Sequence, residues 1–253
     1  MRHTLFLTLL SALFPCSSVW SEEAMVEIHA QLVPKRYTTL SAEIAGRIES
    51  LTVQEGSRFK EGQTLASMDC ALQRSQLDEA RATVAVADKT RSVQKRLLQL
   101  NSGGVLEAEM AAAEAEKARA RWHSSQILVG KCALVAPFPG RVVEQKVREH
   151  QYVQAGQALL DILDDSSMEL EFIAPSSYFS ALRPGSPFQI HVLETGKSYP
   201  AQITRLGAKV DSVSHTIKVV GVLNTANPEL LAGMSGRVQL SPPAEKTASS
   251  AAP

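Results

Sequence analysis

The sequence has few aromatic residues and no long run of charge of one sign. Aromatic side chains make up 5% of the 253 residues. That is little for one thick globular core, and it favours an elongated protein of thin modules. The 26 basic and 26 acidic residues balance each other. Because the basic residues form no cluster, we expect no nucleic-acid partner.

Motifs that carry catalysis or bind cofactors are also missing. No glycine-rich phosphate loop follows a predicted strand, and no G-x-S-x-G nucleophile motif occurs. The six histidines lack the spacing of metal ligands. We therefore predict no catalytic residue, no cofactor and no metal site. An exported carbohydrate-active enzyme or peptidase with a β domain is a weaker alternative, since no convergent acids support it.

Long hydrophobic runs are absent as well. The first 14 residues begin with basic side chains and continue with about ten apolar ones, which is too short for a spanning helix of roughly 20 residues. We interpret residues 1–21 as a secretory signal peptide cleaved after Ser21. Phe14 and Pro15 precede Cys16 where a lipidation site needs small residues, so we expect no lipid there. The predicted location is the periplasm.

Two cysteines remain after such cleavage. Cys70 precedes the first predicted helix and Cys132 follows the second. An even pair in an oxidising compartment is a disulfide candidate, but a pair of buried free thiols is the equal alternative. Helix axes lie about 8–10 Å apart and a disulfide requires Cα atoms within about 7 Å, so the chain would have to narrow at this point.

One short unit occurs twice. Residues 42–69 and 136–163 align without a gap at an offset of 94 residues. The matching residues of the first copy are Ala42, Gly46, Arg47, Val53, Glu55, Gly62, Gln63 and Leu65. Because about 28 residues cannot enclose a core, we expect the copies to be two halves of one lipoyl-like β-sandwich, formed by residues 41–69 and 132–167. A lipoyl or biotinyl carrier would need a lysine at a hairpin between the halves, and a helical segment stands there instead.

Residues 70–131 are rich in strong helix formers and predict an antiparallel coiled-coil hairpin with its turn at residues 101–105. Each arm would be roughly 35–45 Å long. The apolar positions at heptad-like spacing are Leu77, Ala80, Val84 and Ala87, then Val86, Thr90, Val93, Leu97 and Leu100 in the first helix, and Leu106, Met110, Ala113, Ala120 and Ile127 in the second.

The rest of the chain reads as β structure. Alternating apolar and polar residues predict a strand in residues 22–40 that joins a small β-barrel at residues 168–240. The barrel should have five or six strands and a short helix at residues 176–182. Residues 241–253 are rich in alanine, serine and proline and are predicted to be a disordered tail. The predicted fold class is mainly β with an inserted α-helical hairpin.

This order of modules resembles the periplasmic adaptor, or membrane fusion protein (HlyD-like), family of efflux pumps. The resemblance rests on the two half-motifs and on the barrel stretches "PSSYFSALRPG", "VDSVSHTIKVVGVL" and "LLAGMSGRVQL". It implies a non-enzymatic adaptor that forms a homo-oligomer, as a hexamer or trimer of dimers, at an inner-membrane transporter of the resistance-nodulation-division (RND) type. Its hairpin would meet a TolC-like outer-membrane channel. An adaptor of an ABC-type exporter or secretion system is the alternative.

The resemblance also points to docking residues at the hairpin tip. Many members have an arginine, a leucine four residues later and a serine seven residues after that. Here Arg96 and Leu100 fit, and Glu107 occupies the serine position. The alternative for Arg96 and Leu100 is an ordinary solvated helix end, and Glu107 departs from the pattern of the family. Many members also have a membrane-proximal domain; we expect none here, which leaves the barrel to face the transporter.

Overall fold

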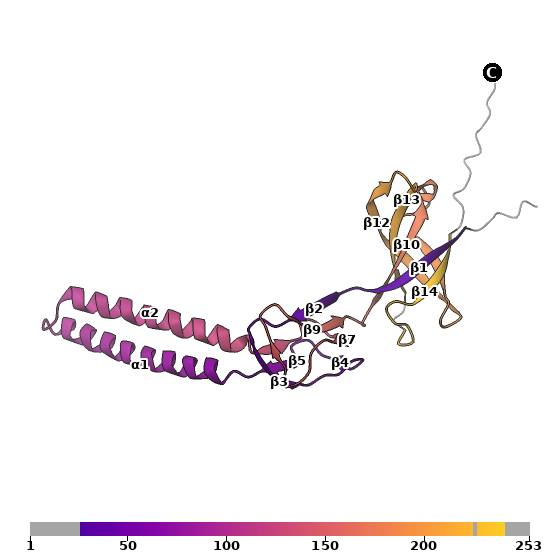
Figure 1. The fold of residues 1–253 in the computed structure, drawn as a ribbon. Coiled ribbons are helices and arrows are strands. Elements are labelled where there is room, and N and C mark those ends of the chain that lie inside the picture. The colour runs from indigo at the N-terminus through magenta and orange to yellow at the C-terminus, as the bar shows by residue number, and fades with distance from the viewer. Residues whose placement is uncertain (1–25, 225–226, 241–253) are drawn as a thin grey trace, which may run out of the picture.

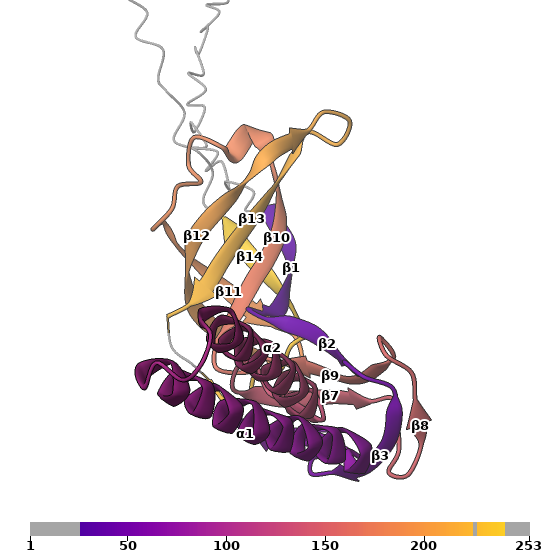
Figure 2. The ribbon, with the colours of Figure 1, turned by 90° about the vertical axis from the view of Figure 1, so that its left-hand side faces the viewer.

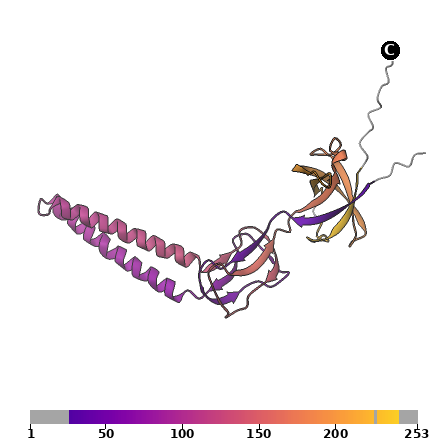
Figure 3. The same ribbon diagram turned by 45° about the horizontal axis from the view of Figure 1, so that its top comes forward.

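The computed structural model describes residues 26–224 and 227–240 and is elongated. A helical hairpin lies at one end, a β-sandwich in the middle and a β-barrel at the other end (Figures 1 and 3). The predicted signal peptide with Cys16, and the predicted tail at residues 241–253, lie outside the described residues.

The sandwich consists of two four-stranded sheets, with strand orders β2-β9-β7-β4 and β6-β5-β3-β8. Each sheet therefore combines strands from both copies of the repeat. The strands are β2 (Tyr37–Ser41), β3 (Gly46–Leu51), β4 (Arg58–Phe59), β5 (Thr64–Met68), β6 (Ala133–Val135), β7 (Gly140–Gln145), β8 (Tyr152–Val153) and β9 (Ala158–Leu163). The prediction that the two halves form one unit is confirmed by this pairing.

The two halves exchange equivalent hydrogen bonds. The backbone N–H of Gly62 donates to the carbonyl of Ala136 at 2.9 Å, and that of Gly156 donates to Ala42 at 2.7 Å. These two bonds are related by the same 94-residue offset as the sequence repeat. The shared core includes Ile48 and Leu65 from one half and Val142, Leu159 and Leu160 from the other. Each half thus supplies both the polar partners and the apolar cover that the other half lacks.

The barrel is closed by six antiparallel strands in the order β1-β10-β13-β12-β11-β14. They are β1 (Val26–Pro34), β10 (Met168–Pro175), β11 (Pro187–Val192), β12 (Lys197–Asp211), β13 (Thr216–Leu223) and β14 (Ser235–Leu240). Inward side chains such as Leu32, Leu170 and Ile190 are fully buried. The predicted small barrel is confirmed. The helix predicted at residues 176–182 is reduced to a 3-10 turn at Ser176–Tyr178.

One predicted boundary is wrong. The barrel strand was expected to extend to residue 40, but β1 ends at Pro34 and Tyr37–Ser41 pairs with β9 of the sandwich. Pro34 has no backbone N–H to continue the barrel ladder, so the chain leaves the barrel there. Lys35 and Arg36 cross to the sandwich.

The two helices, α1 (Ala71–Gln99) and α2 (Val105–Gly130), lie side by side and antiparallel (Figures 1 and 2). The buried residues of α2 are the small Ala115 and Ala118. Asp88 of α1 forms an ion pair with Arg119 of α2.

The apolar stripe predicted for the second helix is not the face that α1 covers. Leu106, Met110 and Ile127 are 65%, 63% and 50% exposed. Two helices can bury only one face each, and the alanine face permits the closer approach. The larger apolar side chains of α2 therefore remain on its outer side.

Candidate functional site: the hairpin tip

The turn at the tip is defined by its backbone. Asn101 has a φ of 52°, and its N–H donates to the carbonyl of Leu98 at 3.0 Å. The next residue, Ser102, donates to the carbonyl of Leu97 at 2.9 Å. These two bonds form a Schellman motif, in which asparagine is the usual substitute for glycine at the left-handed position. The sequence therefore ends α1 sharply at Gln99, with Leu100 as the C-cap residue.

The second helix begins at a glycine, and the carboxylate of a glutamate in the first turn lies close to that glycine. Gly104 is the N-cap residue of α2, and Glu107 lies in the first turn. A Cβ atom on Gly104 would lie 1.8 Å from the carboxylate oxygen of Glu107, so this side chain folds back over the helix start. A negative charge there is favourable for the helix dipole and matches the reciprocal position of a capping box. Glu107 thus has a local role at the tip.

Arg96 and Leu100 lie one helical turn apart at the end of α1 and share a face. Leu100 is 55% exposed. Arg96 is also exposed, forms no ion pair with another described residue, and sits in the last turn, where a cation favours the helix dipole. The turn separates both of them from Glu107, whose side chain folds back over Gly104.

Three further apolar residues at the tip were not predicted as site residues. Val105 is 59% exposed, and Leu106 and Met110 are exposed to a similar degree. Together with Leu100 they form an apolar cap, defined here as Leu100, Val105, Leu106 and Met110. The sequence contained a signal for this exposure in the alanines at positions 108, 111, 115 and 118. Their spacing places them on one face of α2, opposite Leu106 and Met110, and indicates that this alanine face packs against α1.

Each broad face of the hairpin carries a groove between the helices. The groove near the tip has a volume of about 600 Å³ and combines Arg91 and Lys95 of α1 with Glu109 of α2. The groove nearer the middle, of about 490 Å³, is lined by Glu79, Glu114 and small side chains. The hairpin therefore presents two grooves that are mainly apolar and carry a few charged side chains, in addition to the apolar cap.

At the base of the hairpin, Cys70 and Cys132 lie side by side. Their Cα atoms are 6.1 Å apart, and their Sγ atoms face each other in the arrangement of a disulfide. Both side chains are buried. The backbone N–H of Met68 donates to the carbonyl of Cys132 at 2.8 Å, which draws the chain together at this point. The narrowing that a disulfide requires is confirmed.

A polar cluster on the outer side of the sandwich is structural in character. Asp161 accepts hydrogen bonds from Lys146 at 2.7 Å, from Thr39 at 2.6 Å and from Tyr37 at 3.0 Å. Lys146 and then Thr39 contribute most to holding the pKa of the Asp161 carboxyl below its ordinary value, against the opposing effect of burial. The same carboxylate raises the pKa of the Tyr37 hydroxyl.

Neither helix of the described residues is long and apolar enough to span a membrane. Within residues 26–224 and 227–240 there is also no cluster of His, Cys, Asp and Glu side chains arranged to hold a metal ion.

Comparison with known families decides the class of protein. The model of the barrel-sandwich hybrid domain of RND membrane fusion proteins (MFP) matches residues 36–165, which are 130 of the 253 residues. The chain belongs to this family. It is a family of adaptors without enzymatic activity, found in the periplasm in association with the inner membrane.

Two curated relatives and a solved structure illustrate what the chain is similar to. An uncharacterized protein of Haemophilus influenzae is 28% identical over 84% of the chain, and nodulation protein NolF of Rhizobium meliloti is 25% identical over 83%. The chain spans 56% and 61% of the length of these relatives. A chimeric MacA-MexA protein, containing the α-hairpin domain of Pseudomonas aeruginosa MexA, has a TM-score of 0.74 at 20% identity, covering 86% of this chain and 79% of its own. That likeness shows a shared fold.

Proposed function

We propose that the protein is a periplasmic adaptor of a tripartite efflux pump, which links an inner-membrane transporter to a TolC-like outer-membrane channel. The observation that carries the proposal is the apolar cap at the far end of the hairpin, in a chain that belongs to a membrane fusion protein family. Four apolar side chains within eleven residues around one turn, each more than half exposed, are typical of a surface that a partner covers. Arg96 beside Leu100 adds a cation at the edge of this surface.

The opposite end of the molecule supports contact with the transporter. At the far end of the barrel, the turn between β12 and β13 carries Val213, which is 91% exposed. Phe179 follows the 3-10 turn at the same end and is 56% exposed. The proposed transporter is of the RND type. An ABC-type exporter is the alternative, and a solved neighbour that combines MacA with MexA favours neither.

The sides of the hairpin support a homo-oligomer, either a hexamer or a trimer of dimers. Val86, Val93 and Leu100 recur every seven residues on α1 and are 68%, 45% and 55% exposed. On α2, Met110 and Ile127 are exposed on the side away from α1. A hairpin with one apolar edge on each helix can pack α1 of one copy against α2 of the next, a head-to-tail contact that closes into a ring when the rotation permits.

Photo-crosslinking in cells tests the two ends separately. A photoreactive amino acid at Leu100 should give an adduct with an outer-membrane channel protein, and one at Val213 an adduct with an inner-membrane transporter. Mass spectrometry of the second adduct decides between an RND and an ABC transporter. If neither position yields a membrane-protein adduct while the protein is present at normal levels, the adaptor proposal is wrong.

Matched substitutions test the tip itself. Arg96→Asp and Leu100→Asp should abolish pump-dependent resistance with only a small decrease of the thermal unfolding midpoint, since a negative charge at the end of α1 opposes the helix dipole. The controls are Arg81→Asp and Leu72→Asp, exposed residues of the same types further down α1, which should retain resistance. A midpoint lowered by several degrees in the tip variants would identify Arg96 and Leu100 as stability positions instead.

A further inference from the structure

Two short segments connect the sandwich to the barrel. Lys35 and Arg36 lie between β1 and β2, and residues 164–167 lie between β9 and β10. Both segments run through the same narrow region between the two units (Figure 1). The relative orientation of sandwich and barrel therefore depends on how these two segments are held.

One buried carboxylate ties the two segments together. The side chain of Asp164 is 1% exposed and accepts a hydrogen bond from Arg36 Nε at 2.8 Å, and its same oxygen forms an ion pair with Arg36 Nη2 at 2.6 Å. It also accepts bonds from the backbone N–H and the hydroxyl of Ser166, at 3.0 and 2.5 Å. In return, the backbone N–H of Asp164 donates to the carbonyl of Arg36 at 2.9 Å. The Arg36 side chain is 47% exposed, so the pair lies at the surface with its carboxylate buried, and its charge-assisted hydrogen bond is specific in geometry.

The clasp, meaning Arg36 and Asp164, is anchored on the sandwich. The guanidinium of Arg36 lies over the ring of Phe138, 4.6 Å from its centroid, and Phe138 belongs to the sandwich core. The next residue, Asp165, forms ion pairs with Arg58 at 2.9 Å and with Arg141 at 3.5 Å. These two arginines face each other on the paired strands β4 and β7. Residues 164 and 165 are thus held to the sandwich, and Ser166 is held through its two bonds to the Asp164 carboxylate.

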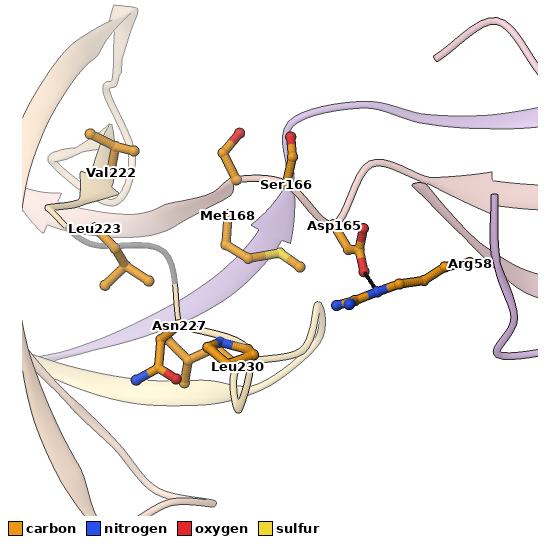
Figure 4. A pocket seen from close by; sticks show the side chains of 10 residues that line it. Arg58, Asp165, Ser166, Met168, Val222, Leu223, Asn227 and Leu230 are labelled. Atoms are coloured by element: carbon orange, nitrogen blue, oxygen red, sulfur yellow. Dashed lines mark hydrogen bonds and ion pairs between the residues drawn. The ribbon is translucent and has the colours of Figure 1, made fainter. Parts of the chain in front are cut away.

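Open space lies on the barrel side of this anchor. A cavity of about 220 Å³ separates Arg58 and Asp165 from the apolar side chains of Met168, Leu223 and Leu230 (Figure 4). The cavity is large enough for water. No packed core joins sandwich and barrel on this side, so the barrel has room to move toward Arg58.

We propose that the joint between sandwich and barrel is a hinge, and that the Arg36–Asp164 clasp sets its angle. With the clasp closed, both connecting segments are held against the sandwich and the barrel has one orientation. Without it, Ser166 loses both of its bonds to the Asp164 carboxylate, the two segments are joined only by the backbone bond between Asp164 and Arg36, and the barrel samples positions that close the cavity. The hairpin extends from the other end of the sandwich, so this angle determines where the tip lies relative to the barrel. The inference concerns the isolated protein and does not depend on the proposed function.

Distance measurements between spin labels test the hinge. Labels on keto amino acids at Tyr152 of the sandwich and Ile173 of the barrel leave the cysteines untouched, and both positions are more than 60% exposed. Asp164→Asn should broaden the distance distribution roughly twofold, since domains without a fixed interface move relative to each other by default. The matched control is Arg47→Gln, which breaks the exposed Arg47–Asp69 pair within the sandwich and should leave the distribution unchanged.

A second pair of variants keeps the test decisive if Asp164→Asn fails to fold. Arg36→Gln should broaden the distribution, and Arg36→Lys, which keeps the charge but not the forked geometry, should give an intermediate width. Circular dichroism establishes that each variant is folded. Folded Arg36 and Asp164 variants whose distributions coincide with that of the wild type would overturn the proposal, and so would equal broadening in Arg47→Gln.

Discussion

Breaking the bond between Cys70 and Cys132 should lower the free energy of unfolding of the hairpin and sandwich by about 4 kcal/mol. The two cysteines are 62 residues apart in the sequence. In the chain-entropy model, a cross-link that closes a loop of about that length removes roughly this much conformational freedom from the unfolded chain. The whole hairpin lies within the loop, so its unfolded form gains the most conformational freedom when the bond is absent.

The folded state should change little on reduction. Both cysteines are buried, and the backbone bond between Met68 and Cys132 holds the base of the hairpin without help from the sulfur atoms. The effect should therefore appear in the urea midpoint and hardly in the circular dichroism spectrum of the native protein. The slope of the transition should also shift, because the reduced chain unfolds to a more expanded state.

The assay is urea unfolding followed by circular dichroism, with and without reductant. Cys16 is replaced by serine in every sample so that only the pair contributes. If the bond exists, none of Cys70→Ser, Cys132→Ser and the double variant should respond to reductant, and the effects of the two single changes should not add, because each change removes the same bond. Mass spectrometry should show a gain of two hydrogens when the unfolded wild type is reduced.

Two buried free thiols would give a different pattern. Both thiols of the unfolded, unreduced protein would react with a thiol reagent, and reductant would leave the midpoint unchanged. The effects of the two serine substitutions on the free energy of unfolding would then add, because each has its own cost of burying a hydroxyl. Either result would refute the disulfide.

Two further predictions concern the sandwich. Because the pKa of Asp161 is lowered in the folded state, its carboxylate stabilises the fold above the unfolded value of about 3.9 and loses this effect as the pH falls through the folded pKa. Asp161→Asn should therefore reduce the fall in the free energy of unfolding, measured by urea unfolding, between about pH 5 and pH 2. Parallel curves of this free energy against pH for the wild type and the variant would contradict this reasoning. His150 has a φ of 66° where the first copy of the repeat has Gly56. His150→Gly should raise the free energy of unfolding by up to about 1 kcal/mol, whereas Gly56→Ala, at the equivalent position, should lower it.

The sequence alone determined much of the architecture. The offset between Ala42 and Ala136 indicated a split sandwich, because neither half could enclose a core. The helix-forming stretch between them indicated a hairpin, and the spacing of Cys70 and Cys132 placed both cysteines at its base. These inferences rest on chain continuity and residue periodicity, which are local properties of the sequence.

Tertiary structure decided what the local pattern left ambiguous. Leu106 and Met110 have the spacing of an inner stripe, yet the alanine face of α2 is the buried one, since only packing against α1 selects between two faces. The chain leaves the barrel at Pro34 because Tyr37–Ser41 pairs with β9 of the sandwich, and only the folded structure shows which strand is its neighbour. The clasp between Arg36 and Asp164 joins residues 128 positions apart, and no periodicity in the sequence connects them, because only the closed barrel and the two interlocked sheets bring the connecting segments together.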